Sequence, residues 1–173
     1  MCIRDSGKRV ELFQYTYRYG DTVFVRDVVH FGQSVAVVPF KDNKNVLLIK
    51  QYRAPVGKWI LEVPAGRVEH HETPEQAAVR ELREEVGYEA AYLRKLVSLY
   101  LSPGYSDEII HIYIAKKLTY VGASPEKGEI LRVIEMPLDM ALKAVLSEDV
   151  VDAKTIIALL IAEKYVADER SEV

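Results

Sequence analysis

The sequence has few of the features that mark secreted, membrane or nucleic-acid-binding proteins. It contains one cysteine in 173 residues, so it cannot form an internal disulfide, and this suits a reducing cytoplasm. No apolar run approaches the ~20 residues that a membrane-spanning helix needs, and no apolar signal-peptide segment is visible near the N-terminus. The formal net charge of −3 argues against a partner held by charge alone, such as nucleic acid or a membrane surface. We therefore expect a cytoplasmic protein that acts on small molecules.

The composition instead fits a small globular enzyme. With 173 residues, of which 49% are hydrophobic, the chain can bury a sizeable core as one domain. Much of it has the β-branched and aromatic content of strands. The expected strands are 10–19 and 23–31, forming a hairpin around Gly20-Asp21; 34–40 and 45–52, forming a buried hairpin; and 59–63, 92–101, 108–117 and 129–136. Apolar content predicts helices at 138–146 and 153–167.

The most informative segment is residues 66–88, which read GRVEHHETPEQAAVRELREEVGY. The segment predicts a short helix rich in carboxylates. Thr73 is a suitable N-cap, Pro74 suits the first helical position, and Gln76 completes a Thr-x-x-Gln capping box. Gly87 can adopt the left-handed conformation that ends a helix. The helix is therefore expected to have defined ends at both termini.

The predicted helix has two different faces at about 100° per residue. An apolar sector that faces a core is expected to contain Ala78, Val79, Leu82 and Val86. The neighbouring sector contains Glu81, Glu84 and Glu85, with Arg80 at its edge. Because Glu81 and Glu85 are four residues apart, their repulsion should destabilise a bare helix by roughly 0.2–0.5 kcal/mol. Some positive charge is expected to offset it.

A divalent cation would offset this repulsion. Magnesium prefers carboxylate, carbonyl and phosphate oxygens, and a cation held by Glu81 and Glu85 could neutralise a pyrophosphate and lower the pKa of a bound water. The Ala65 carbonyl, next to a glycine that permits close backbone approach, could supply a further ligand. The alternative is a solvated acidic helix face with ion pairs such as Arg80–Glu84.

The spacing within residues 66–88 resembles the Nudix box of nucleoside-diphosphate hydrolases: Gly, five residues, Glu, seven residues, then Arg-Glu-apolar-any-Glu-Glu-any-Gly-apolar. Other motifs resemble the ADP-ribose pyrophosphatase branch of that superfamily. They are Gln51-Tyr52-Arg53, the LEVPAG run at 61–66, the LSPGYSDE run at 101–108 with Pro103, and the Asp-Ala-Lys-Thr segment at 152–155. The resemblance covers most of the chain.

The resemblance implies an α+β Nudix fold, in which a mixed β-sheet is sandwiched between helices, with an added N-terminal antiparallel hairpin. It implies hydrolysis of ADP-ribose to AMP and ribose 5-phosphate with Mg²⁺ or Mn²⁺. Metal ligation would fall on Glu81, Glu85 and the Ala65 carbonyl, with Glu84 contributing, while Arg80 would orient the glutamates. The implied substrate contacts are Arg53, Glu62, Glu108 and Gly104.

The general base stays open at this point. Related enzymes often take a glutamate from a mobile loop, here the loop that begins at Thr119, which could close on the substrate. Glu129, which precedes an apolar strand, is the first choice and Glu126 the second. Glu84 within the box is a third possibility.

The family commonly forms dimers in which the N-terminal strands cross to the partner. We therefore expect a homodimer formed through residues 7–33 and a Nudix domain at 34–173. The alternatives are a Nudix pyrophosphatase acting on another nucleotide sugar or a dinucleotide, and a non-catalytic ADP-ribose-binding Nudix domain. Such binding domains typically lose box glutamates, and this chain retains them.

Residues 1–6, with the sequence MCIRDS, fit no structural pattern. They can be back-translated into the end of a common transposon-type sequencing adapter. We expect this segment to be non-native, with native sequence beginning near Gly7; an ordinary disordered terminus is the alternative.

Overall fold

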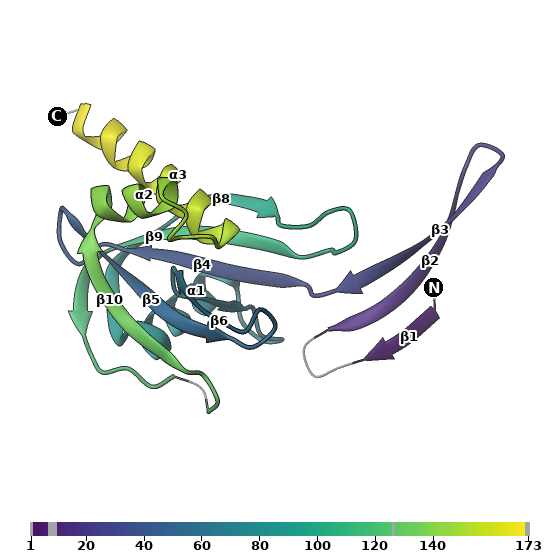
Figure 1. Cartoon of the computed structure of the whole chain (residues 1–173), viewed down its shortest axis with the longest axis horizontal. Coiled ribbons are helices and arrows are strands. Elements are labelled where there is room, and N and C mark those ends of the chain that lie inside the picture. The colour runs from purple at the N-terminus through teal and green to yellow at the C-terminus, as the bar shows by residue number, and fades with distance from the viewer. Residues whose placement is uncertain (1, 7–9, 126, 172–173) are drawn as a thin grey trace.

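The computed structural model describes residues 2–6, 10–125 and 127–171 (Figure 1). The strands are β1 (Cys2–Ser6), β2 (Glu11–Tyr19), β3 (Thr22–His30), β4 (Gln33–Pro39), β5 (Asn45–Arg53), β6 (Lys58–Glu62), β7 (Ala65–Arg67), β8 (Tyr88–Tyr100), β9 (Ile109–Tyr120) and β10 (Leu131–Pro137). The helices are α1 (Pro74–Glu81), which continues into the π-helical turn η1 (Leu82–Val86), then α2 (Leu138–Leu146) and α3 (Ala153–Ser171). Among the described residues, no helix has both the length and the apolar content to cross a membrane.

A four-stranded mixed sheet forms the centre of the body, in the order β7-β4-β9-β8. Strand β4 pairs parallel with β9 and antiparallel with β7. Alternate residues of β4 enter different apolar clusters, because successive side chains of a strand point to opposite faces. Val35 and Val37 pack with Ala78 and Leu82 of the α1–η1 segment, whereas Ala36 packs in the cluster that includes residues of α2 and α3. The sheet therefore lies between helices, and the predicted fold class is confirmed.

The predicted hairpin of residues 34–40 and 45–52 is wrong. Strands β4 and β5 belong to different sheets, since β5 pairs with β10 and β6 in a second, three-stranded sheet. A single antiparallel bridge, Phe40 with Val46, joins the two segments. Both strands are buried on both faces over most of their length. Such runs need cover on each face, and their apolar pattern does not reveal which strand lies beside them.

The N-terminal hairpin, strands β2 and β3, projects from the body (Figure 1). It forms where the sequence predicted it, with Gly20 at a φ of +57° in the turn. Its base is joined to the β8–β9 loop by a bridge between Val29 and Ser106. The sequence predicted no structure for residues 1–6, yet Cys2–Ser6 forms strand β1 against β2. The foreign origin of that segment stays a prediction.

Candidate active site

The carboxylate-rich helix begins and ends as predicted. The Thr73 hydroxyl accepts a hydrogen bond from the Gln76 amide, and the Gln76 side chain accepts one from the Thr73 amide. This reciprocal pair and Pro74 at the first helical position set the start of α1. Gly87 ends η1 with a φ of +79°. Local chemistry therefore fixes the segment that carries the acidic residues.

The buried face of this segment is not the predicted one. The buried residues recur every four positions, namely Ala77, Glu81 and Glu85, and Ala78, Leu82 and Val86. Val79 is 42% exposed, so its predicted place in the core is wrong. The π-helical turn is wider than an α-helical one, and the spacing of four keeps Glu81 and Glu85 on one buried face.

Two glutamates of the helix are buried against the loop that precedes it. Glu81 is 8% exposed and Glu85 is 1% exposed. Glu85 Oε2 accepts a hydrogen bond of 2.8 Å from the Ala65 amide. At Gly66, a Cβ atom would lie 1.7 Å from Glu81 Oε1, so only glycine leaves room for this carboxylate. The close approach expected at Gly66 is therefore confirmed, and the approaching group is Glu81.

The burial of these carboxylates changes their ionisation. Burial raises the pKa of Glu81 to about 7, although Arg80 opposes the rise. Burial also raises the pKa of Glu85 to about 8, although the hydrogen bond from Ala65 opposes it. The charge of Glu129 adds to both increases. A nearby cation would lower both pKa values and allow Glu81 and Glu85 to be ionised together beside Glu129.

Arg80 uses every N–H of its guanidinium. Nε and Nη2 donate to the two oxygens of Glu72, Nη1 donates to Glu81 and Glu84, and Nη2 also donates to the Arg67 carbonyl. An arginine has five N–H groups, and all five donate hydrogen bonds in this arrangement. Arg80 therefore contacts two of the predicted metal-binding glutamates, Glu81 and Glu84, and its orienting role stays a prediction. The Arg80–Glu84 ion pair of the solvated-face alternative is also present, at 3.0 Å.

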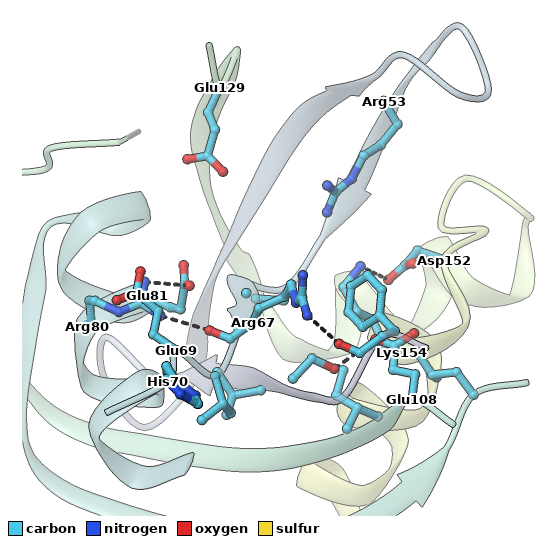
Figure 2. Close-up of a pocket in the computed structure, with 18 residues that line it drawn as sticks. Arg53, Arg67, Glu69, His70, Arg80, Glu81, Glu108, Glu129, Asp152 and Lys154 are labelled. Atoms are coloured by element: carbon cyan, nitrogen blue, oxygen red, sulfur yellow. Dashed lines mark hydrogen bonds and ion pairs between the residues drawn. The ribbon is translucent and has the colours of Figure 1, made fainter. Parts of the chain in front are cut away.

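Arg80 and Glu81 line one side of a cavity of about 760 Å³ (Figure 2). Its walls come from the β3–β4 joint, the end of β5, β7 with the loop after it, α1, the residue after β8, the start of β9, the segment before β10 and the start of α3. Of the predicted site residues, the lining includes Arg53, Ala65, Arg80, Glu81, Glu108 and Glu129. Segments distant in sequence therefore converge on one cavity.

A cationic pair lies on the opposite side of this cavity. Arg53 donates two hydrogen bonds of 2.7 Å to Glu62, and Lys154 from α3 also binds Glu62. Lys154 further contacts Asp152 at 3.0 Å. Burial alone would raise the pKa of Glu62, but its bonds with Arg53 and Lys154 lower it below the ordinary value. Glu62 is 1% exposed, so in this geometry it holds the two cations that face the cavity.

Sequence reasoning did not single out Lys154 and Asp152. The signal was present in the Asp-Ala-Lys-Thr segment, because Asp152 caps α3 by accepting hydrogen bonds from the Thr155 amide and hydroxyl. The Thr155 hydroxyl in turn accepts a bond of 2.9 Å from the Val63 amide. The start of α3 is therefore attached to the strand that leads into the Ala65 loop.

The remaining predicted residues are placed as follows. The Ser34 hydroxyl donates a 2.8 Å hydrogen bond to Glu108, which lines the cavity. Gly104 lies in the β8–β9 loop, outside the described lining. Glu129 also lines the cavity and lies above Arg80 and Glu81, with its carboxylate pointing toward them (Figure 2). Glu126, the second candidate base, lies outside the described residues.

The donor set fits a hard divalent cation. Glu81 and Glu85 bring carboxylate oxygens to the Ala65–Gly66 backbone, which matches the oxygen preference of Mg²⁺. Within the described part of the chain, no three His, Cys, Asp or Glu side chains are already arranged as a metal cluster. A full coordination sphere would therefore need backbone, water or substrate oxygens beside these two side chains.

Comparisons with known proteins find relatives over most of the chain. A family model described as "NUDIX domain" matches residues 30–160. An "ADP-ribose pyrophosphatase" of Bacillus subtilis (strain 168) is 41% identical over 157 residues, covering 89% of this chain and 85% of the relative. A "Methanol dehydrogenase activator" of Bacillus methanolicus is 40% identical over 136 residues, covering 78% of this chain and 74% of the relative. A solved structure, "Crystal structure of ADP compounds hydrolase", shares the fold, with a TM-score of 0.86 and 22% identity, covering 96% of this chain and 91% of that one.

Proposed function

The chain belongs to the Nudix family, and on that premise we propose that it hydrolyses the pyrophosphate bond of ADP-ribose, releasing AMP and ribose 5-phosphate. One observation carries the proposal. Glu81 lines one side of a cavity whose other side carries Arg53 and Lys154, and the buried Glu85 carboxylate accepts a hydrogen bond from Ala65, which also lines the cavity. A diphosphate needs cationic partners on its oxygens and a metal-binding group at the bond that is cut.

The metal would be Mg²⁺ or Mn²⁺, held by Glu81, Glu85 and the Ala65 carbonyl, with Glu84 contributing. When bound, such a cation neutralises phosphate charge and lowers the pKa of a bound water. The raised pKa values of Glu81 and Glu85 support this assignment, since two neighbouring buried carboxylates ionise together more readily beside a cation. Arg80 holds Glu81 and Glu84 in place.

The substrate would lie against the cationic side. Arg53 suits phosphate oxygens, because its planar guanidinium presents several donors at once. Lys154 would add a second positive charge, and Glu62 would hold both cations. Glu108 suits ribose hydroxyls as an acceptor, with Gly104 in the loop beside it.

Glu129 is the proposed general base. It lines the cavity on the side of Glu81, and its charge is close enough to raise the pKa of both buried glutamates. A carboxylate at this place could take a proton from an attacking water. Glu84 and Glu126 remain the alternatives.

We further propose that the protein works as a cytoplasmic homodimer joined through the N-terminal hairpin. Tyr17, Val23 and Val25 of the hairpin are 47–54% exposed, and a two-stranded hairpin is marginal unless it packs on something. Light scattering at micromolar concentration is expected to give a dimer mass; a monomer mass would rule this assembly out. The adapter origin of residues 1–6 also stands as a proposal, tested by recovering the source gene with a different upstream coding sequence.

A substrate panel tests the proposed activity. The protein should be assayed with Mg²⁺ against ADP-ribose, other nucleotide sugars and dinucleotides, with AMP and ribose 5-phosphate identified as products. ADP-ribose is expected among the best substrates. Faster cleavage of another nucleotide sugar would reassign the substrate within the family, and tight binding without turnover would identify a ligand-binding domain instead. The Glu85→Gln variant, expected to lose more than about tenfold in turnover, checks that the measured activity belongs to this site.

A further inference from the structure

One peptide group at the base of the N-terminal hairpin lies between two opposite charges. The Phe31 carbonyl accepts a 2.6 Å hydrogen bond from Arg67 Nη2. On the other side of the same peptide, the Gly32 amide donates to Asp107 Oδ1 at 3.3 Å, and the Phe31 amide donates to the same oxygen at 2.8 Å. Hydrogen bonds with one ionised partner are stronger than neutral ones. The Phe31–Gly32 peptide is therefore held from both sides.

This peptide is the point where the hairpin leaves the body. Strand β3 ends at His30 and β4 begins at Gln33, so Phe31 and Gly32 are the whole connection. The His30 ring also contacts the Asp107 carboxylate. Asp107 and Arg67 therefore contact this two-residue connection directly, beside the Val29–Ser106 bridge that also joins the hairpin base to the body.

Arg67 connects this joint with the acidic helix. Its guanidinium lies over the Phe31 ring, 4.7 Å from the ring centre, and its side chain lines the cavity. Its own carbonyl accepts the hydrogen bond of 2.9 Å from Arg80 Nη2, one of the five that Arg80 makes. The other bonds of Arg80 end on Glu72, Glu81 and Glu84, so Arg67 and Arg80 together connect the hairpin base with the carboxylates.

We propose that Arg67 is a positioning residue that ties the base of the N-terminal hairpin to Arg80 and so sets the placement of Glu81 for the cation. Arg67 acts through Phe31 on one side and Arg80 on the other, without touching the reacting atoms. The path runs through contiguous hydrogen bonds, from the Phe31 carbonyl to the Arg67 side chain and from the Arg67 carbonyl to Arg80. The inference rests on the proposed cation site, although it does not depend on the identity of the substrate.

The test measures cation binding without any substrate. Mn²⁺ is titrated into the full chain by calorimetry, for wild type and for Arg67→Met, Arg67→Lys and Asp107→Asn. Arg67→Met is expected to weaken Mn²⁺ binding by roughly threefold to tenfold, the size of effect seen along coupling networks. Arg67→Lys keeps a charged donor for the Phe31 carbonyl and is expected to lie between wild type and Arg67→Met. Urea unfolding of each variant confirms that the chain is folded.

A double-mutant cycle separates transmission from a local effect. If Arg67 and Asp107 act through the same peptide, Arg67→Met combined with Asp107→Asn should weaken Mn²⁺ binding little more than the stronger single change. Arg132→Met is the matched control, because Arg132 also lies over an aromatic ring, Trp59 at 5.6 Å, on an exposed strand position. It should bind Mn²⁺ like wild type.

The outcomes decide the inference independently of the substrate. Mn²⁺ affinity within twofold of wild type in Arg67→Met, or simple additivity in the cycle, would overturn it even if ADP-ribose is hydrolysed. Weaker and non-additive Mn²⁺ binding would support it even if another diphosphate proves to be the substrate.

Discussion

Arg53 donates two parallel hydrogen bonds to Glu62, from Nε to Oε1 and from Nη2 to Oε2, each 2.7 Å long. Lys154 binds the same carboxylate from α3, which begins far along the chain. The carboxylate is 1% exposed, whereas the Arg53 side chain is 33% exposed and lines the cavity. The buried Glu62 carboxylate therefore fixes the position of the partly exposed Arg53 guanidinium.

Removing the charge of Glu62 should destabilise the protein. Glu62→Gln leaves two cations without their shared carboxylate, and the expected cost is about 3 kcal/mol of unfolding free energy, the lower end of the range for a broken buried pair. Urea unfolding measures it. The exposed pair of Lys41 and Glu135 supplies the control, because an exposed ion pair contributes little to stability, so Glu135→Gln should cost clearly less than Glu62→Gln. Equal losses in both variants would contradict the role assigned to Glu62.

The same pair predicts a dependence of stability on pH. The pKa of Glu62 is lower in the folded state than its ordinary value of 4.5, so the unfolded chain binds its proton more readily. This contribution is present in full above pH 4.5 and is lost as pH falls through the folded pKa. The difference in unfolding free energy between wild type and Glu62→Gln should therefore shrink steadily below pH 4.5. A difference that is constant down to pH 3 would show that charge is not its cause.

A methyl group at position 66 should abolish most of the activity. In Gly66→Ala the added Cβ would overlap Glu81 Oε1, so the carboxylate must move. A displacement of about 1 Å at a catalytic group can cost on the order of 100-fold in rate, and kcat is expected to fall by that amount. Gly20→Ala is the control, since Gly20 has a φ of +57° but no atom within 4 Å of the added carbon. It should lose stability through backbone strain while its kcat is unchanged.

Glu129→Gln distinguishes the candidate bases. If Glu129 takes the proton from water, kcat should fall by roughly 100-fold to 10,000-fold, while Mn²⁺ affinity stays close to that of wild type. Glu84→Gln should instead weaken Mn²⁺ binding, because Glu84 contributes to the proposed cation site. The two effects are read by steady-state kinetics and by calorimetry on the same preparations. A normal kcat in Glu129→Gln would shift the assignment to Glu84 or Glu126.

Cation binding should raise the melting temperature of the wild type. Ligand at 100 times its dissociation constant stabilises a folded protein by about 2.7 kcal/mol, so Mg²⁺ is expected to raise the midpoint by several degrees and a chelator to reverse the change. Glu85→Gln should be as stable as wild type or more stable without metal, because one of two neighbouring buried acids is gone. It should gain little from Mg²⁺. Equal stabilisation of both proteins would place the cation elsewhere.

The sequence by itself determined the local features of this protein. The Thr73 capping box, the glycine end at Gly87 and the adjacency of Glu81 and Glu85 all depend on groups within a few residues of one another. Interactions over such distances follow from helix geometry and residue type. For the same reason the strands, the N-terminal hairpin and both later helices lay close to their predicted places.

Only the tertiary structure decided what surrounds that helix. The pairing of β4 with β9, the exposure of Val79, and the Lys154–Glu62 contact across 92 positions all depend on how segments distant in sequence pack together. Such contacts depend on which apolar faces cover one another. The sequence of a strand buried on both faces is a continuous apolar run, which does not indicate the strand that pairs with it. The carboxylates could therefore be found in the sequence, whereas the cationic side of the cavity and the link through Arg67 became visible only in the folded chain.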